Sequence, residues 1–351
     1  MPPPALKTHL KGNKQTVTSF AFSPSNEQFA AASTDKTVAI YSLEGKNSRC
    51  LKFEQNYEII DIDWSVKNLL ASVGKEKVVN IFEPIIHKGY TEQIVAHQGN
   101  IRSVHFSNSG NRLITASDDK SIKMFRLSHR NFMHSYTGHT NWIRCARFSP
   151  NNKLIASCAE DKTLKIFDSE TREVIHTFKD EKGFGNQLCW HRDSNLIAVA
   201  QENARVKIFD LKARKLIQYY RIFDDGVNCL DFHPSGNYLI TGSSDGHTKV
   251  LDLLEGRDIY TLKGHQDSVT AVKFSKDGDY FVTGSKDRHI MVWKSNITAA
   301  TFDKESSIDE VVTPKCMEDK ENARGEFKDF SVTIDARCSD NYLRNDDVIE
   351  V

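Results

Sequence analysis

The stretch Ser117-Asp118-Asp119-Lys120-Ser121-Ile122 decides the fold, because closely related stretches recur along the whole chain. It returns as Ala159-Glu160-Asp161-Lys162-Thr163-Leu164 and, further on, as Ser285-Lys286-Asp287. The positions equivalent to Asp119 are 35, 76, 119, 161, 203, 245 and 287, so successive steps are 41, 43, 42, 42, 42 and 42 residues. This near-constant period indicates that the chain is built from seven equivalent units.

Each unit has the same internal order of short apolar runs and turns. In the fourth unit, Gly138-His139 precedes an apolar run that ends at Phe148, and a turn rich in Pro and Asn follows. A second run, the aspartate turn, a third run at Thr163–Asp168 and a fourth run then lead to the next unit. Four short strands in about 42 residues are typical of one propeller blade. We therefore predict an all-β, seven-bladed WD-repeat β-propeller.

The two ends of the repeat array predict how the ring closes. The seventh unit ends after its third strand, at Trp293-Lys294, while Ala5–Lys11 resembles the fourth strand of another unit. We expect this N-terminal strand to complete the last blade, which removes an exposed sheet edge. One propeller would then occupy residues 5–296. Residues 297–351 contain 14 acidic and 7 basic side chains and no repeat, so we predict a flexible, disordered acidic tail.

Composition excludes several classes of function. The chain has 351 residues with 47 basic and 47 acidic side chains, so it has no overall positive charge for nucleic acid or for an anionic membrane. No apolar run is long enough to span a bilayer. The seven cysteines are dispersed, unlike those of disulfide frameworks or zinc sites. We expect no cofactor, no metal, no small-molecule substrate and no membrane or nucleic-acid partner.

Catalytic motifs are missing as well. The sequence has no phosphate-binding loop, no H-E-x-x-H and no G-x-S-x-G. His139 and Asp161, like His265 and Asp287, have the spacing of a conceivable catalytic pair. The same pair recurs in blade after blade, which favours a structural role over catalysis. We predict that the protein is not an enzyme.

The structural role is a buried hydrogen-bond relay within each blade. The turn aspartate is expected to face the histidine, and a Ser or Thr of the second strand and a Trp of the third strand extend the network. The fifth and sixth units lack the histidine and are expected to rely on apolar packing. The predicted relay residues are His265, Ser285, Asp287 and Trp293 in the last blade, with His139, Asp161, His97 and Asp119 in two others.

A second set of residues is expected at the mouth of the central channel. The innermost strand of each blade lines this channel, and the residues around its first apolar position point to one rim. Trp and Arg on a rigid rim are typical of binding hot spots. Two interpretations stay open, a protein-binding rim or arginines that only pair with acids beside a Trp packed between blades. The rim residues are Arg102, Trp142, Arg144, Phe184, Asn186, Asn228, Asp118 and Glu160.

The outer strands carry basic residues as well. Examples are Arg126, His129 and Arg130 in the third unit and Arg214-Lys215 in the fifth. The first interpretation is a solvated surface, and the alternative is a surface for an acidic partner.

Several stretches resemble one known family. They are Ile101–Phe106, Asn141–Pro150, Phe232–Thr241, Leu251–Arg257 and Val292–Asn296. Together they resemble the centriolar WD-repeat proteins of the proteome of centrioles protein 1 family. The usual C-terminal coiled coil of that family is not recognisable in this tail.

The resemblance implies a scaffold of centrioles and basal bodies that supports centriole assembly, centriole stability and cilium formation. It implies a location in the cytoplasm and cytoskeleton, at the centrosome and the cilium basal body. The expected partners are centriolar and microtubule-associated proteins, with the acidic tails of tubulin as one hypothesis. The alternative function is a substrate adaptor of a ubiquitin ligase or of a chromatin complex.

Overall fold

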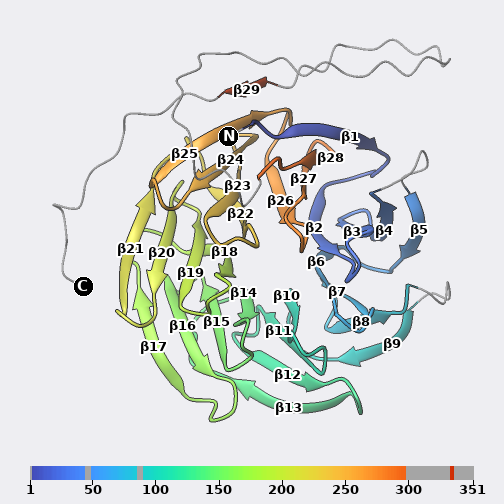
Figure 1. The fold of residues 1–351 in the computed structure, drawn as a ribbon. Helices are drawn as coiled ribbons and strands as arrows, with labels where there is room; N and C mark the ends of the chain where they lie inside the picture. The colour runs from blue at the N-terminus through green and yellow to red at the C-terminus, as the bar shows by residue number, and fades with distance from the viewer. Residues whose placement is uncertain (1, 44–48, 85–89, 298–332, 336–351) are drawn as a thin grey trace.

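The computed structural model describes residues 2–43, 49–84, 90–297 and 333–335, and the regular elements in these residues are all β-strands. They form seven sheets that surround a central channel (Figure 1). No helix in these ranges is long and apolar enough to cross a membrane. The sequence prediction of an all-β, seven-bladed propeller is confirmed.

Within a blade the strands are antiparallel, and in blades one to six they follow chain order from the channel outward. Blade one contains β2 (Val17–Phe22), β3 (Gln28–Ser33), β4 (Thr37–Ser42) and β5 (Arg49–Glu54). Blade two contains β6 (Ile59–Trp64), β7 (Leu70–Gly74), β8 (Val78–Phe82) and β9 (Tyr90–Val95). Blade three contains β10 (Ile101–Phe106), β11 (Arg112–Ser117), β12 (Ile122–Arg126) and β13 (Asn131–Tyr136).

The remaining blades repeat this plan. Blade four contains β14 (Ile143–Phe148), β15 (Leu154–Ala159), β16 (Thr163–Asp168) and β17 (Val174–Lys179). Blade five contains β18 (Gly185–Trp190), β19 (Leu196–Gln201), β20 (Val206–Asp210) and β21 (Lys215–Tyr220). Blade six contains β22 (Val227–Phe232), β23 (Tyr238–Ser243), β24 (His247–Asp252) and β25 (Arg257–Lys263). Blade seven contains β26 (Val269–Phe274), β27 (Tyr280–Ser285), β28 (His289–Lys294) and β1 (Ala5–Lys11).

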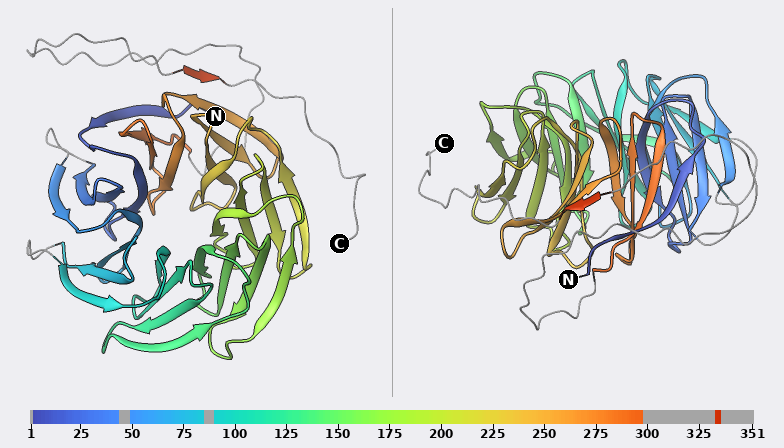
Figure 2. Two further views of the ribbon diagram at one scale, coloured as in Figure 1. Left: turned by 180° about the vertical axis from the view of Figure 1, so that it is seen from behind. Right: turned by 90° about the horizontal axis from the view of Figure 1, so that it is seen from above.

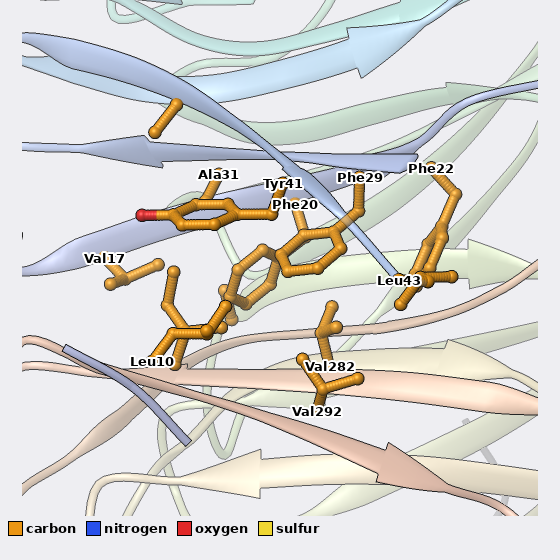
Figure 3. Packing of buried hydrophobic residues seen from close by; sticks show 13 residues of the cluster. Leu10, Val17, Phe20, Phe22, Phe29, Ala31, Tyr41, Leu43, Val282 and Val292 are labelled. Atoms are coloured by element: carbon orange, nitrogen blue, oxygen red, sulfur yellow. The ribbon is translucent and has the colours of Figure 1, made fainter. Parts of the chain in front are cut away.

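The N-terminal strand closes the ring, as expected from the sequence. β1 pairs antiparallel with β28, with Leu6 opposite Trp293 and Lys11 opposite His289. Buried side chains from β1, blade one and blade seven then pack into one cluster (Figure 3). Within it the ring of Phe29 stacks on Tyr41 with centroids 5.3 Å apart. Blades share their apolar cores with neighbours because a single four-stranded sheet cannot bury both faces alone.

Each innermost strand carries a β-bulge at the same repeat position. The register between the first and second strands shifts between Val17 and Ser19, and the same shift recurs in all seven blades, at intervals of 42 residues. A bulge leaves one residue unpaired and re-aims its side chain. The bulged residues include Arg102, Arg144, Asn186 and Asn228, which are four of the eight predicted rim residues.

The top face is defined here as the face that carries these bulges and the aspartate turns. Strands run between this face and the opposite one, as the edge-on view of Figure 2 shows. The hairpins between the third and fourth strands lie at the opposite face, on the outside of the ring.

Part of the C-terminal segment lies on the outside of blade six. β29 (Thr333–Asp335) pairs antiparallel with β25, with Ile334 opposite Leu262, and makes this sheet five-stranded. Apart from Ile297 and β29, the acidic tail predicted for residues 297–351 lies outside the described residues.

Candidate functional site

Three blades contain a histidine held between a carboxylate and a hydroxyl. In blade seven His265 Nδ1 lies 2.9 Å from Asp287 Oδ2, and its Nε2 lies 2.9 Å from Thr283 Oγ1. Trp293 Nε1 donates to the same hydroxyl at 3.1 Å. Blades three and four repeat this arrangement at 2.7–2.8 Å, and the residues are His97, Asp119 and Thr115, and His139, Asp161 and Ser157.

The assignment of Ser285 to this relay is wrong. The hydroxyl beside the histidine belongs to Thr283, two residues earlier on β27. Ser285 Oγ instead donates to the backbone oxygen of Asp267 at 2.9 Å and accepts from the amide of Asp287 at 3.0 Å. Ser285 therefore orders the aspartate turn, while Thr283 connects His265 to Trp293.

The relay lowers the pKa of its aspartates. Burial alone would raise the pKa of Asp287, but the hydrogen bond and charge of His265 and two backbone amides outweigh it and lower the value to about 2. Burial is outweighed in the same way at Asp119 and Asp161, whose pKa values lie still lower. The carboxylates are thus held ionised by their partners, and each relay is a satisfied structural network.

Blade five replaces the relay with another polar network, so the expectation of purely apolar packing is wrong there. Asp180 accepts hydrogen bonds from Gln201 Nε2 at 2.5 Å and from the ammonium group of Lys207. In blade six, Lys249 Nζ lies 2.9 Å from the buried carboxylate of Asp258. The sequence signal for these networks is weak because the residue types differ from blade to blade.

The rim over blades three to five contains two arginine–aromatic stacks. Arg102 makes a bidentate contact with Asp118, with Nε to Oδ1 at 2.7 Å and Nη2 to Oδ2 at 3.1 Å. Its guanidinium carbon lies 5.7 Å from the ring centroid of Trp142 in blade four. The Trp142 side chain is 43% exposed. The indole therefore lies on the surface of the rim and is not packed between blades.

The second stack repeats the first, one blade further on. Arg144 Nη2 lies 2.5 Å from Glu160 Oε1, and its guanidinium carbon lies 5.4 Å from the ring centroid of Phe184. In both stacks the acid belongs to the same blade as the arginine and the aromatic residue to the next. The pairing of the arginines with acids is present, whereas the packing of Trp142 between blades is not, and the protein-binding rim stays a prediction.

Asn186 and Asn228 differ from the other predicted rim residues. The amide of Asn186 donates to the backbone oxygen of Val227 at 2.9 Å. The amide of Asn228 donates to Val269 O at 2.8 Å and to Ser268 Oγ at 3.0 Å, both in the region of blade seven. These side chains connect neighbouring blades, so the structure separates them from the arginine–aromatic stacks.

A set of channel residues was missed by the sequence analysis. Side chains on the innermost strand of one blade accept a hydrogen bond from a backbone amide of the next blade, 43 residues along the chain. These contacts measure 2.7–3.1 Å, and the acceptors are Asp61, Asp63, His105, Gln187 and Asp231. The recurring separation of 43 residues is the sequence signal that could have identified them.

The channel itself encloses about 160 Å³ lined by residues of all seven blades. Its two cationic side chains are paired, since Arg147 Nη2 lies 3.1 Å from Asp61 Oδ2 and Lys273 Nζ lies 2.9 Å from Asp231 Oδ1. Burial lowers the pKa of His105 well below its usual range. These channel groups satisfy the unpaired edges of the innermost strands. Among the described residues, no group of three or more His, Cys, Asp or Glu side chains is placed to hold a metal ion.

Comparison with known families identifies the repeats. The family described as "WD domain, G-beta repeat" matches residues 5–42, 89–126, 130–168, 215–252 and 256–294. A second family, described as "Anaphase-promoting complex subunit 4 WD40 domain", matches residues 180–232. Propellers of the WD40 type are typically non-catalytic scaffolds.

Curated relatives share only part of their length with this chain. Protein HIR1 of Gibberella zeae is 26% identical over 148 residues, which are 36% of this chain and 14% of that protein. Protein hir1 of Schizosaccharomyces pombe is 29% identical over 136 residues, 32% of this chain and 14% of that protein. Nuclear distribution protein PAC1 of Arthroderma benhamiae is 29% identical over 128 residues, 33% of this chain and 28% of that protein. The chain thus spans less than a third of the length of these relatives.

These relatives correct the expectations drawn from the centriolar resemblance. The matching proteins carry the names HIR1 and PAC1 and are not members of the proteome of centrioles protein 1 family. The expected centriole scaffold function, the centriolar and microtubule-associated partners including tubulin, and the location at the centrosome, basal body and cytoplasm are therefore wrong. The resemblance misled because its quoted stretches contain residues that any repeat of this type uses for its turns and inner strands.

The family assignment itself rests on broader evidence. The five matched segments together cover more than half of the 351 residues, and each covers the outermost strand of one blade and three strands of the next. The chain belongs to the WD domain, G-beta repeat family.

Proposed function

We propose that this chain is a non-enzymatic docking module of a chromatin complex, which holds a partner protein on the rim over blades three to five. The observation that carries this proposal is the pair of stacks in which Arg102 and Arg144 support Trp142 and Phe184. The two aromatic side chains lie one blade apart on a rigid frame, so a partner meets a preformed surface. Preorganisation lowers the entropy cost of binding.

The chemistry of the rim suits protein recognition. Trp and Arg are enriched among residues that dominate binding energy, particularly where they are held in a fixed position. Each arginine is positioned by a carboxylate and still exposes a face of its guanidinium group, because Arg102 and Arg144 are only half-buried. A partner with aromatic and carbonyl groups could extend these stacks and accept the remaining guanidinium protons.

Similarity to the HIR1 proteins favours a chromatin complex as the setting. A second candidate is a substrate adaptor of a ubiquitin ligase. The match of residues 180–232 to a domain of anaphase-promoting complex subunit 4 favours it. Residues 180–232 begin beside Phe184 and include the bulged Asn186 and Asn228, so this candidate would use the same side of the ring.

Proximity labelling of partners in dividing cells tests both candidates. The variant Trp142→Ala with Arg144→Ala removes one half of each stack, and we expect it to lose its nuclear partners. The matched control is Tyr57→Ala, which removes an exposed aromatic side chain from the loop that joins β5 of blade one to β6 of blade two. If the double variant retained every partner of the native chain, the rim would not be the binding site. Chromatin proteins among the lost partners support the first candidate, and ubiquitin-ligase subunits support the second.

A further inference from the structure

The outer strands of blades three, four and five expose apolar side chains at one repeat position. Phe132, Val174 and Leu216 are 42 residues apart and are 55%, 42% and 39% exposed. Ile175 and Tyr219 on the same strands are exposed too. Single exposed apolar residues are common, but here they recur at an equivalent position in three adjacent blades.

Blade six shows that this position need not be apolar or exposed. Its equivalent residue is Asp258, which is buried and paired with Lys249 at 2.9 Å. A blade of the same architecture can therefore fill the position with a satisfied polar network. In blades three to five this position holds apolar side chains that are exposed to water.

The three outer strands lie side by side. β13, β17 and β21 follow one another along the circumference of the ring (Figure 1). Tyr136 Oη at the end of β13 donates to the backbone oxygen of Ser169 in blade four at 2.8 Å. Phe178 of β17 packs on Phe209 of blade five, with ring centroids 4.7 Å apart. We call this surface, centred on Phe132, Val174 and Leu216, the outer band.

Basic side chains border the outer band. Residues 126–136, 168–179 and 210–221 together hold eight basic and four acidic side chains. Arg172 and Arg214 precede Val174 and Leu216 by two residues and are exposed. Within the described ranges neither guanidinium group forms an ion pair, whereas Arg130 pairs with Glu92.

The backbone at these arginines is left-handed, as it is at ten other non-glycine residues in the described part of the chain. Arg130, Arg172 and Arg214 have φ values of 54°, 70° and 53°, and blade six has Gly256 at φ 71° in the equivalent place. An L-residue other than Gly, Asn or Asp is disfavoured in this left-handed region. Because this conformation recurs in other turns, it is a feature of the turns, and only the exposure and charge of Arg172 and Arg214 bear on binding.

We propose that the outer band is a second docking surface, which binds an acidic segment of a partner protein that also presents apolar or aromatic side chains. The apolar residues would be covered by the partner, and Arg172 and Arg214 would pair with its carboxylates. A protein segment fits better than a nucleic acid, because two of the three central side chains, Val174 and Leu216, are aliphatic and offer no planar surface for base stacking. This surface is separate from the rim, so it does not rest on the proposed function above.

The probe for a direct test is a random copolymer of glutamate and tyrosine, measured by fluorescence anisotropy against the full chain. The variant Phe132→Ser, Val174→Ser, Leu216→Ser should lower affinity at least about tenfold. The variant Arg172→Glu, Arg214→Glu should lower it similarly and weaken its dependence on salt. Both changes lie on exposed side chains, so the variants should fold, which thermal unfolding checks.

Matched controls isolate the outer band. Leu254→Ser removes a 70% exposed apolar side chain from the corresponding hairpin of blade six and should leave the affinity unchanged. Undiminished binding by either outer-band variant would overturn the proposal. So would equal affinity for polyglutamate without tyrosine, or for a DNA duplex that depends on the same residues.

Discussion

The rim over blades three and four and the rim over blades six and seven use the same backbone position in opposite ways. The bulged residue is Arg102 or Arg144 on one side and Asn228 or Thr270 on the other. The short side chains donate to backbone oxygens of the next blade, Asn228 to Val269 and Thr270 to Val17. The long arginines stack on aromatic rings of the next blade, on the exposed Trp142 and on the half-buried Phe184.

This difference teaches that side-chain length decides whether the position joins blades or faces a partner. Asn228 and Thr270 use their donors within the ring, so they offer little to a ligand. A guanidinium group has five donors, so it can satisfy an acid of its own blade and still expose a polar face. The predictions below test this division, beginning with the relays that both sides share.

Acid should remove the contribution of the relays on both sides of the ring. The pKa of Asp287 is about 2 in the folded protein and near 4 in the unfolded chain, so its stabilising effect is full above pH 4 and disappears toward pH 2. This residue alone should account for about 2 kcal/mol of unfolding free energy, and Asp119 and Asp161 add to it. Urea unfolding between pH 5 and about pH 2 measures the slope. A flat profile would show that the relay carboxylates are not held ionised by folding.

Removal of a single relay carboxylate should cost less than acid, which protonates all three. Asp287→Ala leaves His265 without its buried partner, and we expect a loss of about 3 kcal/mol in unfolding free energy. Asp119→Ala in blade three should lose a similar amount, because its contacts have the same geometry. Chemical denaturation of the two variants compares the unfolding free energy lost in blade seven with that lost in blade three. A large cost on one side only would mean that the two relays are not equivalent.

Asn228→Ala should affect stability and leave binding intact. The variant loses donors to Ser244 Oγ, Ser268 Oγ and Val269 O, and the expected loss is about 1–3 kcal/mol. Partner labelling should match that of the native chain. Loss of partners without loss of stability would show that Asn228 contacts a partner and does not join blades.

Arg102→Ala should do the opposite. Its ion pair with Asp118 is partly buried, but Asn100 still donates to the same carboxylate at 3.0 Å, so we expect about 1 kcal/mol of lost stability. The stack on Trp142 disappears, and partner labelling should fall clearly. Thermal unfolding and labelling of the same preparation separate the two effects. Arg102→Lys is the stricter control, because it keeps the charge but not the planar group.

The fold could be predicted from the sequence because the determinants of a blade are local and periodic. The aspartate turn and the aromatic end of the innermost strand recur at a fixed interval, which predicts the number of blades. The Ala5–Lys11 strand precedes the first full unit, which predicts how the ring closes. Networks with changing residue types, such as Asp180 with Gln201 and Lys207, could not be read in this way.

The candidate site was harder because it depends on the bulge, which leaves no mark in the residue types. Sequence spacing placed Asn228 and Arg144 in one group, and only the backbone geometry separates them. The choice of Ser285 over Thr283 failed for a related reason, since both hydroxyls lie on the same strand. A constant separation of 18 residues from histidine to hydroxyl, seen at His97–Thr115, His139–Ser157 and His265–Thr283, was the available signal.

The pairing of β1 with β28 affects how the protein folds during synthesis on the ribosome. Its partner β28 is translated last among the blade strands, so Leu6 must wait for Trp293 before it can pair. At translation rates of about 5–20 residues per second, the nascent arc stays open for roughly 15–60 s. During that interval β1 and the open side of blade one can bind chaperones or other nascent chains. Slow translation near the 3′ end of the message would lengthen this interval and increase misassembly.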